Sequence, residues 1–111
     1  MTEFTRGAVR LHILHHAAEG EIHGAWMADE LAEHGYTISP GTLYPLLHRM
    51  QDEGLLTSRQ HTEAGRVRRV YAITAHGRDE LEAQRRALAE LAREVLGNDA
   101  SVADPRAEGT L

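Results

Sequence analysis

The sequence contains no cysteine and no lysine, and its longest apolar runs are short. The absence of cysteine excludes disulfides, a thiol nucleophile and a thiolate metal site. No run approaches the roughly 18 apolar residues of a membrane span, and no secretory leader pattern is visible. There is also no glycine-rich phosphate loop, nucleophile elbow or H-E-x-x-H motif. We therefore expect a cytoplasmic protein that is not an enzyme and does not enter a membrane.

Charge is distributed unevenly along the 111 residues, which suffice for one domain. The net charge is −5, yet residues 38–78 carry six Arg and three acidic residues, a local excess of +3. The acidic excess lies in the two flanking segments. Because a local patch decides whether a polyanion can dock, the acidic total does not exclude nucleic-acid binding.

Two helices are expected in the first third of the chain. Residues 6–18 have a 3.6-residue apolar period, with an inward arc of Leu11, Leu14, Ala17 and Ala18 and with Ile13 at its margin. Residues 24–34 form the second helix, with Met27 and Leu31 facing inward. Gly35 follows at the position of a left-handed C-terminal cap.

A third helix has the clearest start signal, with Ser39 as N-cap and Pro40 at the first helical position. It ends at Gly54. Its apolar stripe consists of Leu43, Leu46, Leu47 and Met50. With that stripe turned inward, the outward residues are Gly41, Thr42, Pro45, His48 and Arg49, with Tyr44 on the flank.

Two strand-like segments, 55–61 and 66–74, flank the turn-prone residues 62–65 and predict a β-hairpin. Thr74 is the expected N-cap of a long last helix. We predict a mainly α fold with a small β-hairpin, a winged helix-turn-helix followed by a long C-terminal dimerisation helix. The expected divisions are a DNA-binding domain over 1–76, the dimerisation helix over 77–97 and a polar, mobile tail over 98–111.

This order of elements predicts contact with double-stranded DNA. The third helix can enter a major groove while the hairpin, or wing, lies on the backbone. Arg49 can grip a guanine edge or a phosphate, and Thr42, His48 and Tyr44 can reach phosphates or base edges. The wing carries Arg66, Arg68 and Arg69. The alternative is a winged-helix protein-interaction module that does not bind DNA.

Three motifs resemble the PadR family of bacterial transcriptional regulators: "SPGTLYPLL", "EGLL" and the R-x-R-x-x-Y-x-x-T-x-x-G run from Arg66 to Gly77. The resemblance spans residues 8–96 and implies a small winged-helix repressor. It assigns DNA reading to Ser39, Gly41, Thr42, Tyr44 and Arg49, and the wing contact to Arg66 and Arg68. The sequence departs from the family pattern after Gly24, where it has Ala25 and then Trp26 at the position where the family usually has an aromatic residue.

The resemblance also implies a homodimer in which the last helix packs on the partner's first helix. The sequence agrees independently, because an apolar seam of Leu81, Leu88, Leu91, Ala92 and Val95 is longer than a small core covers. The alternative is a helix folded back on its own domain. A symmetric dimer predicts a pseudo-palindromic operator.

Two kinds of effector are possible, and no cofactor is required. The resemblance implies a small aromatic or lipophilic molecule, for which Trp26 offers a stacking surface unless it serves only in packing. Alternatively, His12 and His16, one helical turn apart, can chelate a divalent metal, with His23, Glu19 or Glu21 completing the site. We expect His15 to lie nearer the apolar arc of this helix than His12 and His16 do. Protonation of a histidine is a third possibility.

Overall fold

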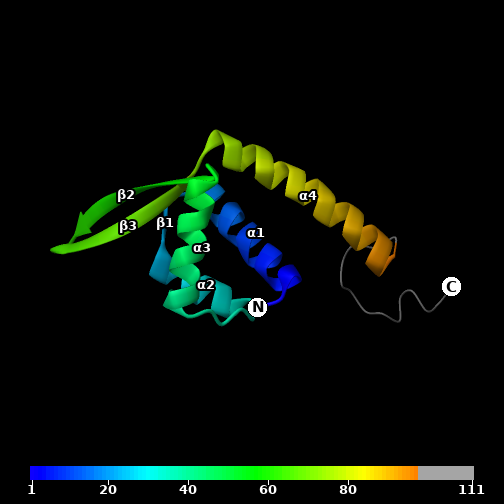
Figure 1. The fold of residues 1–111 in the computed structure, drawn as a ribbon, viewed down its shortest axis with the longest axis horizontal. Coiled ribbons are helices and arrows are strands. Elements are labelled where there is room, and N and C mark those ends of the chain that lie inside the picture. Colours follow the sequence, from blue (N-terminus) through cyan, green and yellow to red (C-terminus); the bar gives the residue numbers. More distant parts are fainter. Residues whose placement is uncertain (98–111) are drawn as a thin grey trace. The chain divides into compact units, whose positions relative to one another are not determined.

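The computed structural model describes residues 1–97, so the predicted tail over 98–111 lies outside the described residues. The elements in chain order are α1 (Glu3–Glu19), β1 (Ile22–His23), α2 (Gly24–Glu33), α3 (Pro40–Asp52), β2 (Leu56–Glu63), β3 (Arg66–Ile73) and α4 (Ala75–Leu96) (Figure 1). The chain forms two compact units, Met1–Leu81 and a second that begins at Glu82. The mainly helical fold class with a small β-hairpin is confirmed.

Helix α1 begins three residues earlier than the sequence predicted. Thr2 is its N-cap, and the Thr2 Oγ1 accepts a hydrogen bond from the Thr5 N–H at 3.0 Å. The buried residues are Val9, Ile13, Leu14 and Ala17. The predicted arc was therefore displaced, because Ile13 is completely buried whereas Leu11 and Ala18 are half-buried.

Helices α2 and α3 agree with the predicted inward faces. Met27 and Leu31 are buried in α2, and Leu43, Leu46, Leu47 and Met50 are buried in α3. Gly35 has φ +90°, and the Tyr36 N–H donates to the Leu31 carbonyl at 2.8 Å. This pattern is the expected left-handed cap. Gly54, with φ +78°, ends α3 in the same way.

The sheet has three antiparallel strands in the order β1-β3-β2, not the hairpin alone. The sequence does not predict β1, because two residues are too few to show an alternating pattern. Strands β2 and β3 pair from Leu56↔Ile73 to Glu63↔Arg66, leaving only Ala64 and Gly65 in the turn. Both turn residues have positive φ, as a two-residue hairpin turn of type I′ requires.

The core of the first unit lies where α1, α2 and α3 meet the sheet and the first turns of α4. Its members include Ile13, Leu31, Leu47, Tyr71 and Leu81. Thr74 caps α4 as predicted, because its Oγ1 accepts a hydrogen bond from the Gly77 N–H at 2.9 Å. Within residues 1–97, no helix combines the length and apolar character needed to cross a membrane.

Candidate nucleic-acid interface

One face of α3 is wholly exposed while the other is wholly buried. The exposed face carries every residue that the sequence turned outward: Gly41, Thr42, Tyr44, Pro45, His48 and Arg49. Ser39, which precedes the helix, is also exposed. The apolar stripe holds α3 against the core, so the polar face is presented on a rigid element. Within residues 1–97, the Arg49 guanidinium makes no ion pair.

The N-terminus of α3 is shaped by Ser39 and Gly41. Ser39 stands at the N-cap position, but its hydroxyl donates to the Thr42 Oγ1 at 3.3 Å and makes no cap hydrogen bond to the backbone. A Cβ atom added at Gly41 would meet nothing nearer than the Ser39 Oγ, at 3.8 Å. The backbone of the first turn is therefore open to close approach from outside.

Tyr44 lies on the flank of α3, against the start of α2. Its ring covers Gly24, where an added Cβ atom would stand 2.4 Å from the Tyr44 Cε1. The side chain nevertheless remains 45% exposed. Gly24 thus leaves room for the Tyr44 ring, whose hydroxyl oxygen would stand 2.9 Å from the same added Cβ atom.

The wing is the distal half of the β2–β3 hairpin, residues 62–69, and all of them are exposed (Figure 1). A two-stranded hairpin with nothing packed on either face gains little stability from its own contacts. Arg66 and Arg68 lie on one face of β3, and Arg69 lies on the other, as predicted from strand alternation. Neither Arg66 nor Arg68 has an ion-pair partner within residues 1–97.

Arg69 lies on the sheet face that meets α3. Its guanidinium donates to the Ser58 Oγ at 3.0 Å, and the Ser58 hydroxyl donates to Gln51 of α3 at 2.7 Å. Burial raises the pKa of Tyr71 on this same face, and the nearby Arg69 charge partly opposes that rise. Arg69 is therefore the wing arginine linked through hydrogen bonds to the third helix, a link that the sequence did not reveal.

Two ion pairs neutralise charged side chains of the basic segment 38–78 with partners outside that segment. Arg59 donates two hydrogen bonds to the Glu21 carboxylate, at 2.6 and 2.8 Å, and this contact lowers the pKa of Glu21. Conversely, Arg10 of α1 pairs with Glu53 at 2.5 Å. One arginine is occupied and one acid is neutralised, so the local excess of positive charge persists.

Arg6 is a further cation near α3, and the sequence did not predict its position. It is exposed near the N-terminus of α1, and it lines a hollow of about 230 Å³ together with Thr42 and Arg49 of α3. Arg6 lies in an acidic segment of the sequence, so neither charge nor periodicity could identify it. The hollow adds a second guanidinium to the edge of the exposed face of α3.

The apolar seam predicted along α4 is divided. Leu81 is 3% exposed and belongs to the core of the first unit, which corrects its assignment to the exposed seam. Leu88, Leu91 and Val95 are 50%, 46% and 68% exposed, and Ala92 is half-buried. From Glu82 to Leu96, no residue is buried within the described part of the chain.

Trp26 is half-exposed at the edge of an open hollow of about 320 Å³, which His16, Glu19 and His23 also line. The indole meets the His16 ring edge-on, with ring centroids 5.3 Å apart. The hollow is large enough for a small aromatic molecule to lie against the indole. Trp26 therefore serves in packing and also presents an open ring surface.

The predicted histidine set is changed by the structure. The ring nitrogens that lie within 4.8 Å of one another are those of His12, His16 and His34, and His23 does not belong to this group. His23 lies on β1, which pairs with β3. Its ring centroid is 6.3 Å from that of His61, which lies on β2. His15 is also corrected, because its side chain is 46% exposed whereas that of His16 is 13% exposed.

A three-helix core, a helix-turn-helix whose second helix, α3, has an exposed polar face, and a basic β-wing together define the winged helix-turn-helix class. The model of the Transcriptional regulator PadR-like family matches residues 13–83. The chain belongs to this family of transcriptional regulators, which confirms the resemblance found in its motifs.

Individual relatives agree with this assignment. The chain is 61% identical over 103 residues to Transcriptional regulator Rv3488 of Mycobacterium tuberculosis, covering 93% of this chain and 96% of that protein. A PadR-like transcriptional regulator from Bacillus cereus has a similar structure, with TM-score 0.77 and 30% identity over 85% of this chain and 93% of that one. Bacillus subtilis PadR, solved in complex with operator DNA, has TM-score 0.62 and 23% identity over 69% of this chain and 47% of that chain.

Proposed function

We propose that this transcriptional regulator is a homodimeric repressor that binds a specific DNA operator through α3 and the wing. The observation that carries the proposal is the division of α3 into a buried apolar face and an exposed polar face, which includes Arg49, an arginine with no ion-pair partner in the described part of the chain. A helix held in this way can enter a major groove without exposing its core face. The complex of Bacillus subtilis PadR with operator DNA is consistent with this use of the fold.

In this proposal α3 supplies both base reading and positioning. Arg49 reads a guanine edge, because a guanidinium donates two parallel hydrogen bonds to guanine O6 and N7. Ser39, Thr42, Tyr44 and His48 donate to phosphates or contact base edges. Gly41 allows the backbone of the first turn to approach the DNA.

The wing and the N-terminus of α1 supply contacts that do not depend on base sequence. Arg66, Arg68 and Arg69 neutralise phosphates beside the groove, and Arg6 adds a phosphate contact from the other side of α3. Three wing phosphates correspond to a log–log salt slope of roughly −2.7 per protomer. Arg59 is not included, because Glu21 occupies its guanidinium.

The exposed apolar stripe of α4 supports the homodimer. The part of α4 from Glu82 to Leu96 contains no buried residue, and a helical segment of this length that packs on nothing is marginal in water. Covering Leu88, Leu91, Ala92 and Val95 with a second copy removes these side chains from water. Because Phe4 of α1 is 74% exposed, the first helix also offers an apolar surface to a partner. A two-fold dimer then requires a pseudo-palindromic operator.

The hollow beside Trp26 is our proposed site for a small aromatic or lipophilic effector. An indole presents a large apolar face on which such a ligand stacks. Because Trp26 is the only tryptophan in the sequence, its fluorescence reports directly on this hollow. The His16 ring against the indole connects an occupant of the hollow to α1.

Replacing Arg49 is expected to reduce sequence preference more than it reduces binding in general. In Arg49→Ala, the ratio of affinities for the operator and for a scrambled duplex should fall about 5- to 150-fold, the 1–3 kcal/mol of a bidentate arginine–guanine pair. Fluorescence anisotropy with DNA from the region upstream of the gene measures both affinities at one salt concentration.

Arg59→Ala is the matched variant, since it removes another exposed arginine of the same basic segment. The ratio of its affinities for the operator and for the scrambled duplex should equal that of the parent protein, because the Arg59 guanidinium is hydrogen-bonded to Glu21. An Arg49→Ala protein that keeps the parent's ratio would exclude Arg49 from base reading.

A further inference from the structure

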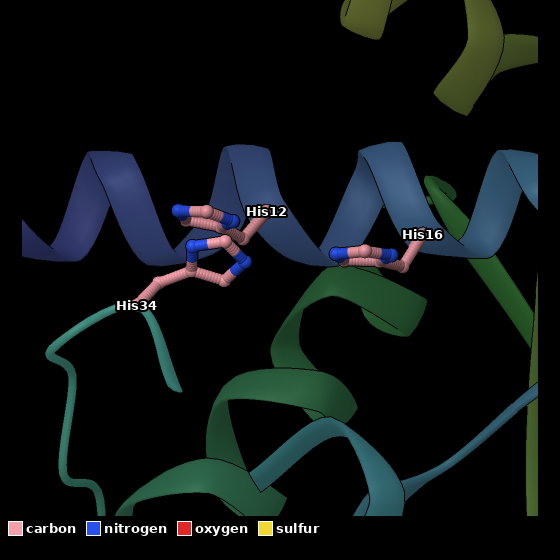
Figure 2. A group of neighbouring side chains, drawn as sticks. All are labelled: His12, His16 and His34. Carbon is pink, nitrogen blue, oxygen red and sulfur yellow. The ribbon is translucent and has the colours of Figure 1, made fainter. Parts of the chain in front are cut away.

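Three histidine rings lie together at one side of the first unit. His12 and His16 project from the same side of α1, and His34 reaches toward them from the end of α2 (Figure 2). Each offers a ring nitrogen, and these three atoms lie within 4.8 Å of one another. The His12 and His34 ring centroids are 4.9 Å apart. Imidazole nitrogens gathered in this way form the usual donor set for divalent transition metals.

The backbone fixes where these rings stand. His12 and His16 are one helical turn apart, so their side chains lie on the same face of α1. His34 is the C-cap residue of α2, and the left-handed Gly35 and the Tyr36–Leu31 hydrogen bond close that helix end. The Tyr36 ring also meets the His12 ring edge-on at 5.4 Å. The three positions are therefore set before any ligand arrives.

Glu30 places a carboxylate beside two of the three rings. Its Oε1 lies 3.3 Å from the His34 Nε2 and 3.5 Å from the His16 Nε2, and its side chain is 21% exposed. The carboxylate thus joins rings from α1 and from α2. Three imidazole nitrogens and one carboxylate oxygen make a four-donor set of the kind that tetrahedral Zn²⁺ accepts.

Glu19 contacts the second ring nitrogen of His16 and so orients that ring. Its Oε1 lies 3.2 Å from the His16 Nδ1, on the ring edge opposite the Nε2 that faces Glu30. A carboxylate that accepts a hydrogen bond from the far nitrogen of a ligating histidine fixes its tautomer and raises its basicity. This arrangement leaves the His16 Nε2 lone pair directed at the space between the rings.

Neutral rings are needed for metal binding, because a protonated imidazole has no lone pair to donate. Burial lowers the pKa of His12, and the nearby His34 and His16 rings lower it further, while Glu30 acts in the opposite sense.

We propose that His12, His16, His34 and Glu30 bind one divalent transition-metal ion per protomer, of the class represented by Zn²⁺. The imidazole and carboxylate donors and the lack of any thiolate favour this class over soft monovalent copper. Zinc–nitrogen bonds of about 2.0–2.1 Å require the rings to close slightly around the ion. The half-exposed His34 has room for that movement.

The ion would join α1 to the end of α2, just before the segment that leads to Ser39 and the start of α3. Bound metal would therefore restrain the end of α2 and, through the segment that follows it, the start of α3. The site itself does not depend on the proposed DNA function, and metal binding can be measured without DNA.

The test uses the full chain, stripped with a chelator and then dialysed against Zn²⁺ alone. We expect one ion per protomer by elemental analysis, and thermal unfolding should shift upward, with the folded-to-unfolded ratio raised about 100-fold at a free zinc concentration of 100 Kd. Co²⁺ in place of Zn²⁺ should give the visible absorption of a tetrahedral complex. His12→Ala and His34→Ala should each weaken binding more than the 10- to 100-fold typical of losing a residue that only orients a ligand.

His15→Ala is the matched variant, because His15 neighbours the site on α1 and belongs to a second cluster with His16 and Glu19. It should bind zinc as the parent does. The far-ultraviolet circular dichroism of each metal-free variant establishes that it is folded. No retained ion in the parent, or undiminished binding in folded His12→Ala and His34→Ala, would overturn the proposal without affecting the DNA proposal.

Discussion

Gly77→Ala is expected to lose about 3 kcal/mol or more of its free energy of unfolding, at or above the upper end of the usual range for overpacking. A Cβ atom at this position would stand 2.2 Å from the Leu55 carbonyl oxygen and 2.7 Å from the Ile73 Cγ1. The oxygen belongs to the backbone and cannot rotate away. The same carbonyl accepts a hydrogen bond from the Thr74 N–H at 3.1 Å. Moving the helix start would therefore break the cap of α4.

Urea unfolding followed by circular dichroism measures this loss. Gly41→Ala is the matched variant, because it adds the same methyl group to a helical glycine whose nearest neighbour is 3.8 Å away. It should keep the stability of the parent protein while lowering DNA affinity through crowding at the α3 backbone. If Gly77→Ala unfolded at the parent's urea concentration, the close packing of α4 on Leu55 would be refuted.

A single charge in the exposed stripe of α4 is expected to dissociate the proposed dimer. In Leu88→Glu or Leu91→Glu each protomer loses a buried leucine, worth about 1.5–3 kcal/mol, and symmetry doubles the loss. Burying the new carboxylate adds a further cost. Together these terms raise the dimer dissociation constant by about 1000-fold or more. Operator affinity should fall with it, because a monomer contacts a single half-site.

Sedimentation equilibrium over a range of protein concentrations measures the dissociation constant directly. Ala83→Glu is the matched variant, since Ala83 is exposed and lies about 120–140° around the helix from Val95 and Leu88. It should dimerise as the parent does. Equal dissociation constants for Leu88→Glu and the parent would rule out the stripe as the dimer contact.

The sequence predicted the third helix well because its signals are local. Ser39 and Pro40 mark its start, and the inward stripe from Leu43 to Met50 is uninterrupted, so the outward residues follow from helix geometry alone. The cap at Thr74 was predicted for the same reason. The exact inward face of α1 depends instead on contacts with distant elements. Ile13, placed at the margin by its period, is completely buried.

Features formed by residues far apart in sequence were not predicted. His34 reaches His12 because α2 folds back on α1, whereas the sequence offered His23, which is nearer in the chain. The Arg59–Glu21 contact and the position of Arg6 beside Arg49 likewise require the folded chain. Leu81 had the right spacing for the α4 seam, but it is buried in the core of the first unit.

The salt dependence of operator binding, measured for the parent and for a variant in which Arg66, Arg68 and Arg69 are all alanine, tests the DNA proposal most directly. The parent should bind with a steep negative log–log slope. The triple variant should lose roughly 2.7 of that slope per protomer while keeping its preference for the operator over a scrambled duplex. Equal slopes, or a parent protein that does not bind DNA, would contradict the account and favour a winged-helix module that contacts protein partners.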